Sequence, residues 1–210
     1  MRKYLVIIGP IAAGKGTQAD RISAKYNMPH ISTGQLFRKE IKDETEIGVE
    51  IKDNIESGGL VPDDITNCVV RRVLDGLDLS KGFIFDGYPR SVEQSKAFFA
   101  MLAERGVALD AAVKLDIAED EIVRRISGRF TCAVCGQNYH DPDVMPKVKG
   151  VCDRCGSRDF IRRSDDRPEV IRRRLENYYL VSRPIEDFYR ARGLLFEIDG
   201  TKLTADGITA

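Results

Sequence analysis

Short apolar runs alternate with longer amphipathic segments along most of the chain. The apolar runs lie at residues 4–8, 29–31, 83–85, 111–115 and 195–198, and a charged amphipathic segment precedes or follows each of them. Alternation of this kind predicts parallel strands that are joined by helical crossovers. We therefore expect an α/β fold in which a five-stranded parallel sheet has helices on both faces.

Two of the helical segments carry start signals. Ser32, Thr33 and Gln35 have the pattern of a capping box, in which Gln35 reaches back to the backbone of Ser32. The stretch VPDD at residues 61–64 places a proline near the first turn of another helix and acidic residues at its positive end. Cys68 falls on the apolar stripe of that helix, so we expect it to fill the core.

The stretch from residue 130 to residue 166 breaks the alternation. It has few aliphatic residues, contains four of the five cysteines and is rich in Gly, Pro, Asp and Arg. Because such a segment cannot bury a core of its own, we expect a small insertion that something other than apolar packing stabilises.

The composition argues against a nucleic-acid-binding, membrane-bound or secreted protein. The 210 residues are 42% apolar, and 33 basic residues balance 33 acidic ones. A neutral chain has no overall attraction to nucleic acids or anionic membranes. The run at residues 4–8 is too short for a signal peptide or a membrane span, and the later runs are equally short. We therefore expect a cytoplasmic protein with reduced thiols, whose cysteines need an explanation other than disulfides.

The spacing of the clustered cysteines predicts a structural zinc site. Cys132 and Cys135 form one CxxC pair, Cys152 and Cys155 form another, and 16 residues separate the pairs. Four thiolates complete a tetrahedron and leave no position for water, so the metal is expected to be structural. A glycine follows each pair and lets the backbone amides turn toward the sulfurs. Disulfides are disfavoured in a cytosolic chain, a redox centre needs only one pair, and we expect nearby His140 to be a bystander.

A glycine-rich stretch, GPIAAGKGTQ at residues 9–18, lies between the first apolar run and an amphipathic segment. This context favours a phosphate-binding loop, in which backbone N–H groups and a helix N-terminus attract phosphate and Lys15 adds a positive charge. The glycine spacing fits the general pattern, but the hydroxyl comes one residue late, at Thr17. The alternative is an ordinary glycine-rich turn between a strand and a helix.

The late threonine is itself informative, because GKGTQ is similar to the loop of nucleoside monophosphate kinases and of the adenylate kinase family in particular. Further signatures of that family follow in order: ISTGQLFR (31–38), GLVPDD (59–64), FDGYPRSVEQ (85–94), RRISGR (124–129), RRSDDR (162–167), RRRL (172–175) and DGTK (199–202). Together they cover nearly the whole chain, which resembles a long-lid adenylate kinase.

The resemblance implies a fold and a division of the chain. A P-loop NTPase-like core is expected from residues 1–31, 62–129 and 167–210. An NMP-binding helical insertion is expected at residues 32–61, and a zinc-binding lid at residues 130–166.

The resemblance also implies a reaction, the reversible Mg²⁺-dependent transfer of a phosphoryl group from ATP to AMP, which gives two ADP and maintains adenine nucleotide homeostasis. Such transfer needs in-line positioning, charge neutralisation and exclusion of water, for which the planar, permanently charged guanidinium is well suited. Eleven arginines lie between residues 124 and 174. The catalytic residues implied by the resemblance are Lys15, Asp86, Arg90, Arg125, Arg129, Arg163 and Arg174.

Each nucleotide has its own implied set of residues. The ATP set is Gly9, Ala12, Ala13, Gly14, Lys15, Gly16, Thr17, Arg125, Arg129, Tyr139 and Lys202. The AMP set is Thr33, Gly34, Arg38, Leu60, Val61, Gly87, Arg90, Gln94, Arg163 and Arg174. Asp86 is expected to hold Mg²⁺ through water, and Asp165 and Asp166 to orient arginines.

Some arginines can be placed on helices. Arg125 and Arg129 are four residues apart, so on a helix they share a face. Arg124, Arg172 and Arg173 have no matched role, and we expect them on a solvated helix face.

The sequence departs from the family pattern at three places. Ile11 and Ala12 replace a proline and a glycine, and if that glycine needs a positive φ, alanine costs roughly 1 kcal/mol or more. Gln35 stands where the family commonly has an acid. The chain ends soon after residue 202, so the usual final helix is expected to be short.

Other functions compete with this hypothesis. A different monophosphate kinase is disfavoured by Thr33 and Gln94, since pyrimidine-monophosphate kinases tend to carry alanine at the position of Thr33. A nucleotide-binding regulator would be catalytically silent if Ala12 distorted the loop. A zinc-ribbon nucleic-acid binder is disfavoured by the neutral charge and the few aromatics in the insertion. Because nothing indicates an obligate partner, we expect a monomer.

Overall fold

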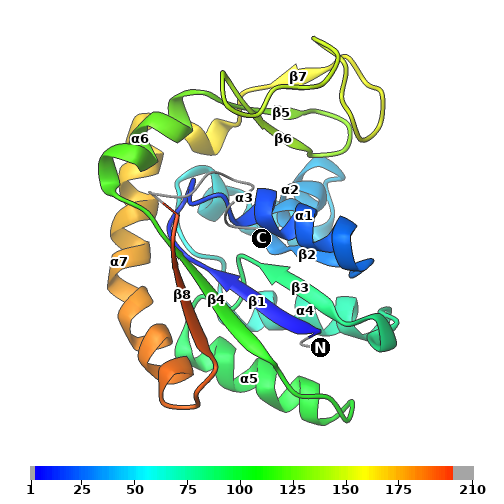
Figure 1. Cartoon of the computed structure of the whole chain (residues 1–210), viewed down its shortest axis with the longest axis vertical. Coiled ribbons are helices and arrows are strands. Elements are labelled where there is room, and N and C mark those ends of the chain that lie inside the picture. The colour runs from blue at the N-terminus through cyan, green and yellow to red at the C-terminus, as the bar shows by residue number, and fades with distance from the viewer. Residues whose placement is uncertain (1–2, 201–210) are drawn as a thin grey trace.

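The computed structural model describes residues 3–200, and a five-stranded parallel sheet forms its centre (Figure 1). The strands lie in the order β2-β3-β1-β4-β8, and every neighbouring pair is parallel. Their bounds are β1 (Tyr4–Ile8), β2 (His30–Ser32), β3 (Phe83–Asp86), β4 (Ala111–Asp116) and β8 (Leu195–Asp199). The predicted α/β fold and its five strands are confirmed, each strand to within one residue of its expected bounds.

Helices connect and cover these strands. They are α1 (Lys15–Tyr26), α2 (Thr33–Lys42), α3 (Glu46–Glu56), α4 (Asp63–Asp75), α5 (Val92–Ala103), α6 (Glu119–Ser127) and α7 (Pro168–Arg190), with single 3₁₀ turns at Leu79–Lys81 and Ser164–Asp166. Within residues 3–200, no helix is both long enough and apolar enough to cross a membrane.

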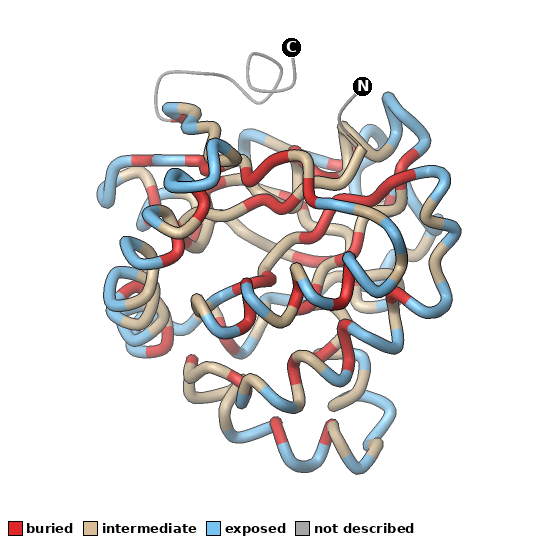
Figure 2. Tube along the Cα trace, turned by 90° about the horizontal axis from the view of Figure 1, so that it is seen from below, coloured by how far each residue is buried: buried red, intermediate tan, exposed pale blue. Residues whose placement is uncertain are grey.

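The central strands are apolar on both sides because the sheet has helices on both faces. Val6, Phe83 and Phe85 pack against α4, α5 and the second half of α7. Ile7 and Ile84 point the other way and pack with α1 and α6. Figure 2 shows the buried residues concentrated along the strands and on the inner sides of the helices. The sheet is therefore rigid, and its carboxyl-terminal edge can position side chains accurately.

The helix start signals have mixed outcomes. The start predicted at residues 61–64 is confirmed, because α4 begins at Asp63. The predicted capping box is wrong: no side chain caps α2 at Ser32, and Gln35 instead donates to the carbonyl of Gly136 at 3.4 Å. The prediction that Cys68 fills the core is also wrong. Its side chain is exposed, and α4 buries Val69, Val70 and Leu74 instead.

Residues 32–61 form a helical pair, called here the α2–α3 segment, beside the sheet. Phe37, Ile51, Val61 and Val69 join the pair to α4 in an apolar cluster of its own. Thr45 caps α3 by accepting a hydrogen bond from the amide of Gly48 at 3.0 Å.

Residues 130–166, called here the lid, contain all but the first residue of a second and smaller sheet. Its strands are β5 (Arg129–Cys132), β6 (Asn138–His140) and β7 (Phe160–Ile161), antiparallel in the order β6-β5-β7. Figure 1 shows this sheet above α1 and α2, at the end of the molecule to which α6 leads. Its buried cluster consists of Cys132, Tyr139 and Cys152, with little apolar material around them. Apolar packing alone is therefore a weak source of stability for the lid.

Candidate active site

The loop between β1 and α1 opens into a cavity of about 890 Å³. Because α1 begins at Lys15, the unpaired amides of its first turn face this loop. The Lys15 ammonium folds back over the loop and donates to the carbonyls of Gly9 at 2.9 Å and Pro10 at 2.6 Å. Burial lowers the pKa of Lys15 to about 8, against the attraction of Asp86. The loop thus presents a desolvated cation together with free amides, which favours an anion.

The backbone of the loop is tight at two positions. Gly9 has φ of 143°, and a Cβ there would lie 2.4 Å from the carbonyl oxygen of Leu115, so only glycine fits. Ala12 has φ of 58°, in the left-handed region that favours glycine. Position 12 therefore does have the positive φ that would favour the glycine found there in the family.

The cavity brings together most of the predicted nucleotide-binding residues. Its walls contain Gly9, Ala12, Ala13, Gly14, Lys15, Gly16, Thr17, Gly34, Arg38, Leu60, Asp86, Gly87, Arg90, Arg125, Arg129, Tyr139, Arg163 and Arg174. An adjoining cavity of about 50 Å³ includes Val61 and Gln94. The walls come from the carboxyl edge of the sheet, the α2–α3 segment, the lid and α7.

Two aspartates at the end of the lid hold the arginines in place. Asp165 accepts hydrogen bonds from Arg163 Nε at 2.8 Å and Arg174 Nη1 at 2.9 Å. Asp166 accepts from Arg129 Nε at 2.7 Å, and a second guanidinium nitrogen of Arg129 also contacts it. Burial alone raises the pKa of Asp165, but the hydrogen bond and charge of Arg163 bring this pKa well below its usual range. The guanidinium groups of Arg129, Arg163 and Arg174 are thereby anchored by the two carboxylates, and each keeps at least one other nitrogen for a ligand.

On the side of the α2–α3 segment, the arginines outnumber the carboxylates that pair with them. Arg38 Nη1 lies 3.8 Å from Asp165, which it shares with two other arginines. Burial, followed by the charge of Arg163, lowers the pKa of Arg38 to about 9, and burial likewise lowers the pKa of Arg174 to about 9. Crowded, desolvated cations of this kind would be stabilised by a bound anion.

Residues predicted for the acceptor base form a buried network. Gln94 donates to Asp63 Oδ1 at 2.6 Å and accepts from the amide of Arg90 at 2.7 Å. Thr33 is buried behind the wall, where its hydroxyl donates to the carbonyl of Asp86 at 3.3 Å. Thr33 lines neither cavity and instead supports the Asp86–Gly87 turn.

Other predicted residues lie less directly in the site. Tyr139 is buried, stacks on Phe130 with ring centroids 5.5 Å apart, and donates its hydroxyl to Cys152 Sγ at 3.4 Å. Arg129 begins β5 after α6 has ended at Ser127, so the expectation that it shares a helix with Arg125 is wrong. Lys202 and the predicted short final helix lie outside the described residues.

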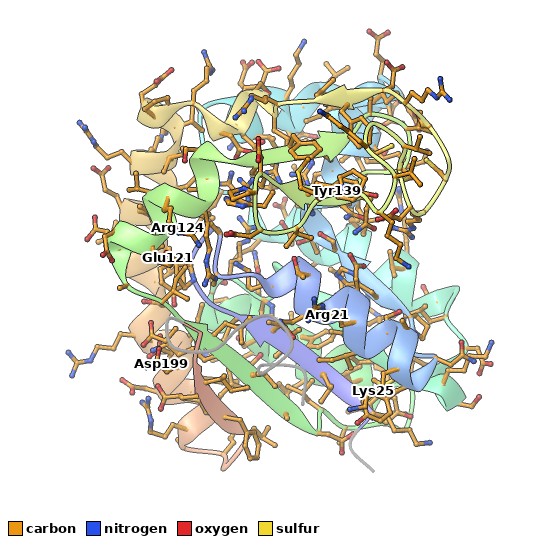
Figure 3. The ribbon with its side chains drawn as sticks, turned by 45° about the horizontal axis from the view of Figure 1, so that its top comes forward. Arg21, Lys25, Glu121, Arg124, Tyr139 and Asp199 are labelled. Carbon is orange, nitrogen blue, oxygen red and sulfur yellow. The ribbon has the colours of Figure 1, made fainter. Side chains whose placement is uncertain are left out.

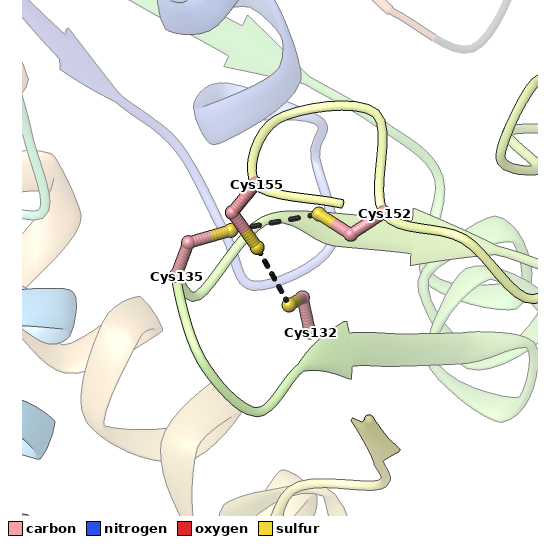
Figure 4. A group of neighbouring side chains, drawn as sticks. All are labelled: Cys132, Cys135, Cys152 and Cys155. Atoms are coloured by element: carbon pink, nitrogen blue, oxygen red, sulfur yellow. Dashed lines mark hydrogen bonds between the residues drawn. The ribbon is translucent and has the colours of Figure 1, made fainter. Parts of the chain in front are cut away.

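The four clustered cysteines meet at one point in the lid (Figure 4). Their sulfurs all lie within 4.8 Å of one another, with Cys132 to Cys155 at 3.6 Å and Cys135 to Cys152 at 3.5 Å. The glycines after each pair, Gly136 and Gly156, have φ of 74° and 72°, which confirms the predicted turns. Such a group can hold one metal ion by four sulfur ligands.

Some cavity residues were missed by the sequence reasoning. Arg124 lies exposed on α6, as expected, with its side chain 50% accessible, but it also lines the cavity and binds both Glu121 and Asp143. The spacing of Glu121, three and four residues before two arginines, was the available signal. Asp143 comes from a lid loop without periodicity. His30 Nδ1 pairs with Asp20 at 2.8 Å while its Nε2 faces Asp86 at 4.0 Å, a juxtaposition that no local pattern encodes.

Comparison with known proteins identifies the family. Residues 7–194 match the adenylate kinase family. An adenylate kinase of Enterococcus faecalis is 45% identical over 198 residues, which are 94% of this chain and 92% of that protein. One of Acidothermus cellulolyticus is 48% identical over 195 residues, 93% of this chain and 89% of that protein. One of Novosphingobium aromaticivorans is 42% identical over 206 residues, 98% of this chain and 95% of that protein. With the phosphate loop and the convergent arginines, these matches establish that the chain belongs to the adenylate kinase family, whose members are ATP:AMP phosphotransferases.

Proposed function

We propose that ATP binds along the phosphate loop and that AMP binds between this loop and the α2–α3 segment. The observation that carries the proposal is the meeting of the loop, in one cavity, with arginines that lie far apart along the chain. The backbone amides at the start of α1 and the Lys15 ammonium would hold the β- and γ-phosphates of ATP. Arg125, Arg129 and Tyr139 complete the donor side, with Lys202 assigned by the family resemblance alone.

The acceptor side uses the second set of residues. Arg38 and Arg90 take the AMP phosphate, and Gln94 faces the adenine with help from Asp63, which holds its amide. Leu60 and Val61 pack beside the nucleotide, while Gly34 and Gly87 bring backbone close to it. Thr33 acts through the Asp86–Gly87 turn that it supports.

The transfer itself needs charge neutralisation more than covalent chemistry. Arg163 and Arg174, anchored by Asp165, would neutralise the transferring phosphoryl group together with Lys15. Closure of the α2–α3 segment and the lid would exclude water, which otherwise competes as the acceptor.

Mg²⁺ is the metal that suits the donor side. Asp86 Oδ2 would lie 3.5 Å from a Cβ at Gly16, so this carboxylate stands directly beside the start of α1 and near Thr17. A carboxylate and a hydroxyl are hard oxygen ligands that Mg²⁺ accepts. Bound with ATP, the ion would supply charge neutralisation on its phosphates.

Zinc is the metal that suits the lid. Tetrahedral coordination with Zn–S bonds of about 2.3 Å requires sulfurs roughly 3.8 Å apart, close to the separations of the four cysteines. Backbone amides of Gln137 and Ser157 already donate toward Cys135 and Cys155, as they do to metal-bound thiolates. This zinc would be structural, and its need for reduced thiols fits a protein that works in the cytoplasm.

The test is ADP formation by the purified protein with Mg·ATP and AMP, CMP, UMP or GMP supplied separately. We expect strong turnover with AMP alone. ATP binding without turnover in a folded, zinc-loaded sample would overturn the proposal in favour of a nucleotide-binding regulator. Strong turnover with a pyrimidine monophosphate would overturn the assignment of AMP.

A further inference from the structure

One carboxylate on α6 pairs with two arginines of the same helix. Glu121 Oε1 accepts from Arg125 Nε at 2.6 Å, and its two oxygens accept from Arg124 Nε at 2.7 Å and Nη2 at 2.8 Å. All three side chains line the nucleotide cavity. Figure 3 shows Glu121 and Arg124 next to one another on α6.

The contact with Glu121 determines which way Arg125 points. Since Glu121 occupies Nε, the two terminal nitrogens of Arg125 face the other way. Nη1 lies 3.5 Å from the carbonyl of Ala13, and Nη2 lies 3.1 Å from the carbonyl of Gly200. The charged edge of Arg125 is thus turned to the end of the phosphate loop.

Burial makes this contact stronger than an ordinary helix-surface pair. The side chains of Glu121 and Arg125 are 19% and 21% exposed, whereas the surface pair of Glu93 and Lys96 is 71% and 57% exposed. Solvent screens exposed pairs of that kind. The hydrogen bond from Arg124 brings the pKa of Glu121 well below its usual range, so the carboxylate is charged at neutral pH.

The same carboxylate is connected to the lid. Arg124 Nη1 lies 2.8 Å from Asp143, which belongs to the loop between β6 and β7 and also lines the cavity. A continuous series of ionic contacts therefore runs from Asp143 through Arg124 and Glu121 to Arg125. The Glu121 carboxylate therefore contacts Arg125 directly and is linked to the lid loop through Arg124.

We propose that Glu121 is a positioning residue of the donor site, which aims Arg125 at the phosphate loop and, through Arg124, ties the lid loop at Asp143 to the same nucleotide. This inference rests on the proposed role of Arg125 in binding ATP.

The first test compares Glu121→Gln with Glu119→Gln, which removes the same charge from the same first turn of α6. In full-length, zinc-loaded protein, we expect Glu121→Gln to raise KM for ATP about three- to tenfold, as for loss of a charge-assisted hydrogen bond. KM for AMP and the melting temperature should match those of Glu119→Gln. Equal changes in both KM values, or no difference from the control, would overturn the inference.

A double-mutant cycle separates positioning from a general structural role. If Glu121 acts through Arg125, the effect of Glu121→Gln on KM for ATP should disappear in an Arg125→Gln background. Persistence of the full effect there would contradict the proposal. A wild-type protein without any ADP formation would instead overturn the proposed function, so the two failures are distinguishable.

The link to the lid has its own control. Asp143→Asn should raise KM for ATP about two- to fivefold, whereas Asp159→Asn, at an exposed acid of the same lid, should leave it unchanged. Combining Asp143→Asn with Glu121→Gln should add little to Glu121→Gln alone. Additive effects, or equal behaviour of the two lid variants, would overturn this part of the proposal.

Discussion

At the scale of single residues, the phosphate loop combines backbone strain with a desolvated charge. Ala12 occupies a left-handed conformation, and Lys15 is held over the loop by two carbonyls. Left-handed φ costs an L-residue about 1–2 kcal/mol, which the surrounding packing must offset. The desolvated charge favours the arrival of an anion, and each feature can be tested by a single substitution.

Replacing Ala12 should reveal the strain. Ala12→Gly removes the left-handed penalty but adds unfolded-state entropy, so its stability should equal or exceed that of the wild type by up to about 1 kcal/mol. Ala24→Gly, at an exposed position inside α1, should instead lose about 1 kcal/mol. Urea unfolding of the three proteins measures the difference. Equal destabilisation by the two glycines would mean that Ala12 carries no strain.

Lys15 should make ATP binding depend on pH. Its pKa of about 8 in the free protein means that it loses its proton above pH 8, whereas phosphate binds the charged form. Affinity for ATP should therefore fall as pH rises from 8 to 9.5, and ATP should draw in roughly 0.5–0.8 proton at pH 8.5. Calorimetry in buffers of different ionisation enthalpy measures this uptake. Lys15→Arg, which stays charged, should lack it; uptake equal to that of the wild type would assign the proton to another group.

At the scale of elements, the lid depends on its cysteines because its apolar cluster is small. Cys132 and Cys152 are buried among only a few aromatic rings. A metal ion that joins both CxxC pairs would connect two otherwise independent loops. The exposed Cys68 of α4 has no place in that cluster and provides a natural control.

Cys152→Ser should abolish zinc binding and loosen the lid. We expect zinc content to fall from one per chain to none, and the free energy of unfolding to fall by about 2–5 kcal/mol. Proteases should then cleave within residues 130–166. Cys68→Ser should retain its zinc and its stability. Metal analysis and limited proteolysis measure both effects, and a zinc-loaded Cys152→Ser protein would contradict the four-cysteine site.

At the scale of the whole molecule, Asp165 joins parts of the chain that are far apart in sequence. It pairs with Arg163 of the lid, Arg174 of α7 and, at 3.8 Å, Arg38 of α2. Direct contacts of the lid with α1 and α2 are longer hydrogen bonds, each 3.4 Å: Gln35 to Gly136, Lys42 to Ala133, and Gln137 to Asp20. The aspartate therefore carries much of the connection between these elements.

Removing the charge of Asp165 should weaken the molecule and its activity together. Asp165→Asn leaves buried guanidinium groups without their partner, which costs about 3–5 kcal/mol. We expect kcat to fall at least about tenfold, since Arg163 and Arg174 lose their anchor. Inorganic phosphate should raise the melting temperature of this variant more than that of the wild type, because an added anion replaces the lost charge. Asp159→Asn should behave as wild type in all three measurements.

Much of the fold was predictable because it depends on local patterns. The five strands are short apolar runs, and the start of α4 follows from proline and acids at residues 61–64. Gln35 and Cys68 were mispredicted for one reason: their environments come from segments that local sequence does not reveal. Gln35 meets the lid 101 residues away, and Cys68 lies on a helix whose buried face the neighbouring α5 selects.

By itself, the sequence determined the chemistry present in this protein: a phosphate-binding loop, a dense set of arginines and two CxxC pairs. These depend on residue type and spacing, which are local properties. Only the tertiary structure decided which charges meet. The pairing of Asp165 with three arginines, and the placement of the helical Glu121–Arg125 pair beside the phosphate loop, follow from how the lid, α6 and α7 pack against the sheet. Electrostatic partnership depends on distance and burial in space, and the linear order of residues encodes neither.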